Sequence, residues 1–243
     1  AILTPPTPAF AQVEQDSFAS IYTLRYGLIN DLQLFTSIPL FYQTNTVDIG
    51  GSGNGISGQR RSRTRTEWGN VSVGLRYALI KEGVGYPDVI PTIVGQIPTG
   101  RNSGSIGGGV ALVKSLDPAV LFANFNYRHA FIDDSSVDLS RLLPEAEDTF
   151  DVTFGYAFAL NDTLTLNTAV AGFFTQRTKF DSTLASGQEV RGILSSQERL
   201  SLQLGLTSLL TENLYIEPSV SFGLTGTGSN AAFGVNIPYT FGF

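Results

Sequence analysis

The chain has no cysteine and no methionine, and its 243 residues include one histidine and one tryptophan. Without cysteine, neither a disulfide framework nor a thiolate metal site can form. Asp, Glu, Lys and Arg make up 15% of the chain, against roughly 25% in an average soluble domain. Apolar runs are short, such as Ala119–Ala123, whereas a membrane-spanning helix needs about 18 or more apolar residues. These absences exclude a helical membrane protein and a disulfide-stapled secreted domain.

The chain does contain many segments in which apolar and polar residues alternate. From Leu214 to Thr225 and from Ala231 to Phe243, nearly every second residue is apolar. The clearest segment covers residues 149–160, with apolar residues at Phe150, Val152, Phe154, Tyr156, Phe158 and Leu160. A period of two indicates a β-strand, and about ten such residues are typical of a transmembrane barrel strand. A soluble β-sandwich or lipocalin-like barrel would instead carry charges on its outer face.

We therefore predict an all-β fold, a transmembrane antiparallel up-and-down β-barrel of about twelve strands. Tight turns are expected at residues 29–31, 116–118, 161–163 and 211–213, and long loops at 44–65, 132–148 and 176–193. Because such barrels have short periplasmic turns and longer extracellular loops, the long loops should face outward. Eleven segments alternate clearly. Residues 9–15 are counted as a separate twelfth strand, so that both ends of the barrel lie in the periplasm.

Several short strings along the chain carry a family resemblance. They are Arg25–Leu28, Asp31–Leu34, Ile38–Leu40, Gly69–Tyr77, Ile97–Gly100, Asp117–Val120 and Ile237–Phe241. Together they resemble outer-membrane channels of the "meta-pathway of phenol degradation" type, and also the barrel that exports subunits in functional-amyloid (Fap) systems. The resemblance implies a barrel of about twelve strands whose lumen is occluded by an N-terminal segment. Residues 1–8 are therefore expected to be mature chain and an extended plug ahead of the barrel at 9–243, with Thr4, Pro5, Pro6 and Pro8 in the plug.

The polar rows of the predicted strands supply the candidate pore-lining residues. The charged and amide candidates are Arg25, Arg76, Arg128, Arg199, Asp151, Glu217, Gln203, Asn124, Asn126, Asn167 and Asn236. The aromatic candidates are Phe35, Phe122 and Tyr215. Because buried charges need partners, we expect the arginines to pair with the acids or with the N-terminal segment. These residues either brace a plugged barrel or line a polar conduit, and the aromatics favour a path for apolar solutes or pack on the plug.

Two further features of the sequence concern phosphate binding and catalysis. The loop arginines Arg60, Arg61, Arg63 and Arg65 could pair with lipopolysaccharide phosphates or form an ordinary solvated run. His129 has no hydroxyl residue beside it in the sequence, and no nucleophile–base pair is evident. We therefore expect no catalytic residues, no metal site and no cofactor.

These observations lead to one functional hypothesis and two alternatives. The hypothesis is an outer-membrane channel for passive transport of small apolar or aromatic molecules, partly occluded by its N-terminal segment. The alternatives are a secretion channel for an amyloid-type polypeptide and a sealed adhesive barrel acting through its extracellular loops. The expected partners are outer-membrane lipid, lipopolysaccharide and a small solute, and no nucleic acid. The oligomeric state stays open.

Overall fold

The computed structural model describes residues 9–51, 59–99, 104–131, 148–176, 178–183, 189–194, 196–225 and 231–241. Within these ranges the regular structure is all β-strand. No helix in the described ranges is both long enough and apolar enough to cross a membrane. The strands are β1 (Ala9–Ile29), β2 (Leu32–Gly51), β3 (Gln59–Trp68), β4 (Val71–Tyr77), β5 (Asp88–Ile97), β6 (Ser105–Leu116), β7 (Ala119–Ala130), β8 (Asp148–Asn161), β9 (Leu164–Thr175), β10 (Thr178–Thr183), β11 (Glu189–Leu194), β12 (Gln197–Thr211), β13 (Leu214–Gly223) and β14 (Ala231–Asn236).

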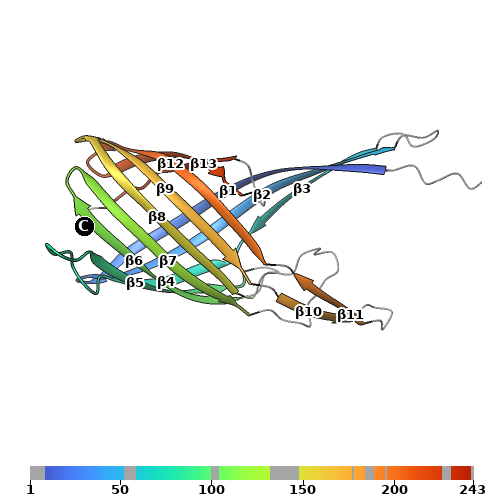
Figure 1. Cartoon of the computed structure of the whole chain (residues 1–243), viewed down its shortest axis with the longest axis horizontal. Helices are drawn as coiled ribbons and strands as arrows, with labels where there is room; N and C mark the ends of the chain where they lie inside the picture. Colours follow the sequence, from blue (N-terminus) through green and yellow to red (C-terminus); the bar gives the residue numbers. More distant parts are fainter. Residues whose placement is uncertain are drawn as a thin grey trace, which may run out of the picture.

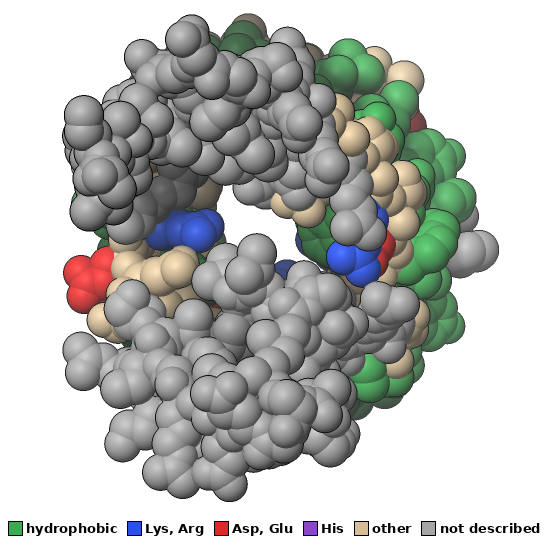
Figure 2. Space-filling view, turned by 90° about the vertical axis from the view of Figure 1, so that its right-hand side faces the viewer, with side chains coloured by type: hydrophobic (Ala, Val, Ile, Leu, Met, Phe, Trp, Pro, Cys, Tyr) green, Lys and Arg blue, Asp and Glu red, His purple; other side chains and the backbone are tan. Residues whose placement is uncertain are grey.

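Twelve of these strands form one antiparallel sheet, as the alternation predicts. Its order is β1-β2-β4-β5-β6-β7-β8-β9-β12-β13-β14, with β3 pairing with β2, and β10 and β11 form a separate hairpin. The tilted strands follow one another around a cylinder (Figure 1), and the end view in Figure 2 shows a ring around a central opening. β1 and β14 are the two ends of the sheet order, and no ladder joins them within the described residues.

The outer wall of the cylinder is apolar. On β8 the outward residues Phe150, Phe154 and Tyr156 are 42%, 53% and 41% exposed. Hydrophobic side chains cover the described part of the outer wall in Figure 2. A soluble protein rarely exposes a patch of this extent, whereas lipid requires it. The wall therefore identifies the fold as a membrane barrel of antiparallel strands.

Tight turns connect the strands at one end of the barrel. They lie at Asn30–Asp31, Asp117–Pro118, Asp162–Thr163 and Glu212–Asn213. Asp31 has a φ of 69°, in the left-handed region that aspartate tolerates better than most residues. The Oδ1 of Asn161 accepts a hydrogen bond from the Thr163 N–H at 2.9 Å, which fixes that turn. These four turns match the predicted positions.

The N-terminal strand differs from the prediction. β1 runs without interruption from Ala9 to Ile29 and pairs along its whole length with β2, so residues 9–15 are not a separate strand. Ala9 consequently lies at the end of the barrel opposite the tight turns and opposite the C-terminal segment (Figure 1). The prediction that both ends of the barrel lie in the periplasm is therefore wrong. The twelfth strand of the sheet is β3 instead.

Two of the predicted long loops also contain strands. β2 continues to Gly51 and β3 begins at Gln59, both inside the expected loop at 44–65, and the β10–β11 hairpin occupies part of 176–193. We call β3, together with the segments Leu40–Ile49 of β2 and Ala11–Ser20 of β1 that lie alongside it, the extension. Its three strands run past the other barrel strands in Figure 1. Between β3 and β4, Gly69 and Asn70 have no strand structure.

Candidate functional site

The inner face of the sheet carries the polar rows that the sequence predicts. Strand register places the candidates on one face: Asn126 pairs with Asp151, and Asp151 with Phe173, which in turn pairs with Arg199. A cavity of about 300 Å³ opens on this face, where Val94, Asn126, Arg128, Asp151 and Phe173 contribute to its lining. Gly109 also lines it, and the absence of a Cβ there leaves room for the Asn126 side chain. We call this space the inner cavity.

A belt of hydrogen bonds holds Arg128 in place beside the inner cavity. The Arg128 Nε donates to Thr149 Oγ1 at 3.3 Å, and its Nη1 donates to Gln96 Oε1 at 3.4 Å. The same Gln96 oxygen accepts from Ser105 Oγ at 2.7 Å, and Gln96 Nε2 donates to Ser72 Oγ at 3.4 Å. Ser105 and Thr149 are each only 5% exposed. The belt crosses five neighbouring strands, from β4 to β8, and fixes the guanidinium that faces the Asp151 carboxylate.

Several other predicted residues lie on the inner face but outside the cavity lining. Glu217 on β13 accepts a hydrogen bond from Asn236 Nδ2 on β14 at 2.6 Å. Asn167 Nδ2 donates to Thr207 Oγ1 at 2.8 Å. Arg199 Nη2 donates to Gln197 Oε1 at 3.3 Å. By strand register, Asn124, Gln203 and Tyr215 also face inward. The structure thus spreads these candidates around the barrel rather than gathering them into one site.

Arg25 on β1 and Arg76 on β4 approach each other, and Arg76 pairs with Thr92 of the cavity lining. The Arg76 guanidinium carbon lies 5.8 Å from the centroid of the Phe35 ring, over its face. Arg25 pairs with Phe35 in the β1–β2 ladder, and Gln33 pairs with Arg76 in the β2–β4 ladder. The expected pairing of the inner arginines with acids is not found within the described residues, where the ion pairs involve other groups.

Three inward aromatic side chains reach over glycines of the neighbouring strand or its edge. Phe35 reaches Gly74, Phe122 reaches Gly155 and Phe41 reaches Gly69. A Cβ on Gly155 would come within 2.5 Å of Phe122 Cζ, and one on Gly69 within 2.6 Å of Phe41 Cε2. The missing Cβ at each glycine therefore provides the space that the ring occupies. Sequence reasoning predicted inward aromatics at Phe35 and Phe122 but not these glycine partners.

A polar cluster that the sequence did not reveal lies on the outer face near the ends of β7 and β8. His129 Nδ1 is 2.9 Å from Asp148 Oδ1, and the same oxygen accepts from the Tyr127 hydroxyl at 2.7 Å. The ring of His129 also makes an edge contact with Phe131. Asp148 is 19 residues from His129 and 21 residues from Tyr127 in the sequence. The pairing of His129 with Asp148 in the β7–β8 ladder brings the three side chains together.

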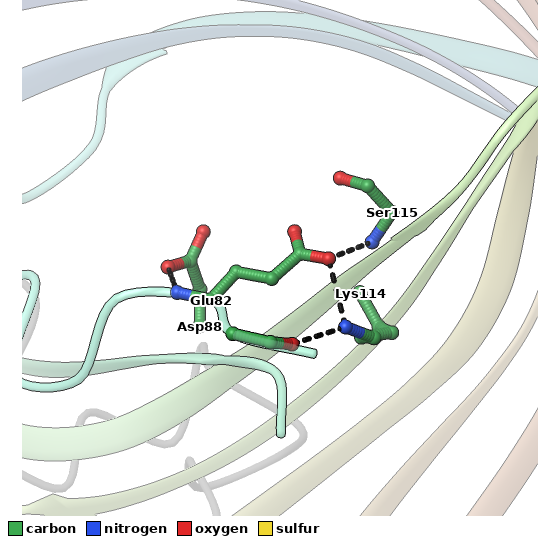
Figure 3. Close-up of polar contacts among 5 residues, drawn as sticks. Glu82, Asp88, Lys114 and Ser115 are labelled. Atoms are coloured by element: carbon green, nitrogen blue, oxygen red, sulfur yellow. Dashed lines mark hydrogen bonds and ion pairs between the residues drawn. The ribbon is translucent and has the colours of Figure 1, made fainter. Parts of the chain in front are cut away.

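A second polar cluster lies beside the end of β6, at the tight-turn end of the barrel (Figure 3). β6 extends past the start of β5, and there Glu82 Oε1 accepts from the Ser115 N–H at 3.0 Å. Lys114 Nζ lies 3.0 Å from the same carboxylate oxygen and donates to the Gly83 carbonyl at 2.6 Å. Glu82 thus takes the place of a missing strand partner. The hydrogen bond from Lys114, and to a smaller extent that from Ser115, holds the pKa of the Glu82 carboxyl below its usual range.

The remaining predicted residues are the four arginines of the first long loop and the residues of the N-terminal segment. Arg65 forms an ion pair with Glu67 on the same face of β3. The backbones of Arg60, Arg61 and Arg63 pair with β2, while their side chains fall outside the described part. Thr4, Pro5, Pro6 and Pro8 also lie outside the described residues. No group of three or more metal-ligating side chains occurs among the described residues.

A solved structure and a family model each match most of this chain. Among solved structures, an outer membrane channel from Pseudomonas putida F1 is similar with a TM-score of 0.59 and 12% identity, covering 93% of this chain and 83% of that one. The open form of the ferric-catecholate import receptor Fiu from E. coli K12 reaches a TM-score of 0.30 and 13% identity, covering 87% and 37%, too low to support an argument. A family model matches residues 4–241. The chain therefore belongs to the family described as "Putative MetA-pathway of phenol degradation".

Proposed function

We propose that the protein is an outer-membrane channel through which small apolar or aromatic molecules cross passively. The observation that carries this proposal is a single sheet with an apolar outer surface and with rows of charged and amide side chains on its inner face. The fold similarity to a protein described as an outer membrane channel supports the transport role. The family's phenol-degradation description supports an aromatic solute.

The composition of the inner cavity supports the same class of solute. Val94 and Phe173 provide apolar surface beside Arg128, Asp151 and Asn126. Ligand sites typically combine an apolar lining with a few polar groups that fix orientation. A general porin for sugars or ions needs no such apolar surface. Passive passage also needs no catalytic residue, and we propose no enzymatic activity.

The N-terminal plug expected from the sequence is not carried into this proposal. Ala9 pairs with Gly51 at the far tip of the extension, on the order of 30 Å from the barrel, whereas eight fully extended residues span at most about 28 Å. Deleting residues 1–8 should therefore leave the single-channel conductance in planar lipid bilayers unchanged. A rise in conductance would show that these residues occlude the opening.

Uptake measurements test the transport role directly. A strain that lacks the gene should take up a radiolabelled phenol more slowly at micromolar concentration, and the cloned gene should restore the rate. If neither uptake nor conductance depends on the protein, with or without residues 1–8, a sealed adhesive barrel is the better description. Secretion of a coexpressed amyloid subunit that requires the protein would instead favour the export alternative.

A further inference from the structure

The inner face of the barrel carries more positive than negative charge. By strand register the described part of the barrel wall carries Arg25, Arg76, Arg128 and Arg199 on this face, against Asp88, Asp151 and Glu217. Arg65 and Glu67 follow on the same row in β3 and pair with each other. Arg128 has Asp151 nearby and hydrogen bonds to Thr149 and Gln96, and Arg199 has a hydrogen bond to Gln197. Arg25 and Arg76 form no ion pair with the acids of the described ranges. Residues 1–8 contain no acidic side chain and cannot neutralise this pair.

Arg76 is the less satisfied of the two guanidinium groups. Its Nε is buried and has no hydrogen-bond partner within the described part of the chain. Its contact is the face of the Phe35 ring, at 5.8 Å from the centroid, and Arg25 is close enough to repel it. Arg25 is exposed to the interior of the barrel, and two like charges held close together favour a counter-anion between them.

Strand register gives the pair a geometry that one small anion can bridge. Arg25 on β1 and Arg76 on β4 lie on either side of β2, opposite Phe35 and Gln33 respectively. Two strand spacings separate their backbones by roughly 10 Å sideways, which two arginine side chains can span from both sides. Gly27 pairs with Gln33 next to this position, and a Cβ there would meet no atom within 4 Å. Open space therefore lies at Gly27, in the same cross-strand row as Arg76 and two residues along β1 from Arg25.

An apolar track leads toward this pair from the extension. Ile21 pairs with Pro39 and Ala19 with Phe41, all on the same inward row as Arg25 and Phe35. Ile21 is 65% exposed and Phe41 44% exposed, although both belong to the row that otherwise carries Thr23 and Ser37. We call Ile21, Pro39 and Phe41 the apolar track. It supplies contact for an apolar body while the arginine pair supplies contact for a charged end.

We infer that Arg25 and Arg76 bind the carboxylate of an amphipathic solute whose apolar or aromatic body lies along the apolar track. Guanidinium groups bind carboxylates through paired charge-assisted hydrogen bonds, and a single carboxylate relieves the repulsion between the two arginines. This inference rests on the proposed channel function and narrows its substrate to organic acids. It also assigns the order of contacts, with the apolar body nearer the extension and the carboxylate nearer the tight turns.

Single-channel recording with benzoate and its neutral isostere benzamide tests the inference. Benzoate should block potassium chloride current through the wild-type channel at a concentration at least about tenfold below that of benzamide, since two charge-assisted hydrogen bonds distinguish them. The double variant R25Q/R76Q should raise the half-blocking benzoate concentration about tenfold or more and leave benzamide unchanged. R199Q is the matched control, because Arg199 lies on the inner face with its own partner, and it should change either value less than twofold.

Equilibrium dialysis of labelled benzoate against the purified protein in detergent separates this site from the channel function. Binding that is lost in R25Q/R76Q but kept in R199Q supports the carboxylate site even if no current is observed. A wild-type protein that conducts but binds benzoate no better than benzamide, or a folded double variant that still binds it, overturns the inference and leaves the channel proposal standing. Heat-dependent mobility in gel electrophoresis confirms that each variant is folded.

Discussion

At the scale of single residues, the glycines under the inward aromatics control the width of the opening. Gly155 carries the Phe122 ring, and a Cβ there would lie 2.5 Å from Phe122 Cζ. The same Cβ would also lie 2.5 Å from the Thr168 carbonyl oxygen, so Gly155→Ala should displace both the ring and the local backbone. We expect a lower single-channel conductance and a stability cost of about 1–3 kcal/mol from overpacking. The control is Gly27→Ala, whose new Cβ meets nothing within 4 Å. Equal conductance of the two variants would contradict this role of Gly155.

Glu82 provides a pH-dependent contact at the tight-turn end of the barrel. Its pKa is depressed by hydrogen bonds from Lys114 and Ser115, so its contribution to stability is present above the unfolded-state pKa and is lost as pH falls through the lower folded-state pKa. The Ser115 amide signal in an NMR titration should therefore have an acidic midpoint below the usual glutamate range. Lys114→Met should move that midpoint upward. An unchanged midpoint would show that Lys114 does not set this pKa.

Single residues also mark where sequence reasoning reached its limit. The inward position of Arg128, Asp151 and Asn126 follows from a period of two, because the side chains of a strand alternate between faces. The contact of His129 with Asp148 depends on the register between β7 and β8, and that of Glu82 with Lys114 depends on how β5, which follows Glu82, pairs with β6. Register between strands is a property of pairs of segments, so no single segment could reveal these contacts.

At the scale of strands, the alternation of surfaces gives a direct stability test on β8. Phe154 faces outward and is 53% exposed, while its neighbour Thr153 faces inward with Ala171 opposite. Phe154→Arg should lower the free energy of unfolding by about 2–4 kcal/mol near the bilayer midplane. Thr153→Arg places the same charge toward the aqueous interior and should cost much less. Guanidinium unfolding in lipid vesicles measures both, and equal losses would mean that β8 does not face lipid.

The strands that sequence reasoning missed share one physical property. β3 reads Gln-Arg-Arg-Ser-Arg-Thr-Arg-Thr-Glu-Trp and lacks an apolar row over most of its length. A strand in the membrane needs such a row to face lipid, but the extension lies beyond the other barrel strands and has no lipid to face. The same reason accounts for β10, whose Thr-Lys-Phe-Asp-Ser-Thr sequence also lacks regular alternation. Alternation therefore predicts the membrane-spanning strands and overlooks strands in water.

At the scale of the whole molecule, the fold class and the position of the tight turns could be predicted, while the direction of the first strand could not. The expectation that both ends of the barrel lie in the periplasm required an even number of spanning strands, and this led to a separate strand at residues 9–15. The sheet instead reaches twelve strands by adding β3 alongside β2, outside the main order. β1 therefore enters from the opposite end, and counting strands alone does not fix where a barrel begins.

The three-stranded extension has a practical consequence for studies on living cells. At about 3.3 Å per residue, the ten residues of β3 project on the order of 30 Å from their junction with the barrel. An epitope tag inserted between Gly51 and Gln59 would follow the end of β2 that lies farthest from the barrel, at the tip of the extension. Antibodies or phage arriving from the medium would meet that tag first, while the pore mouth below stayed unobstructed.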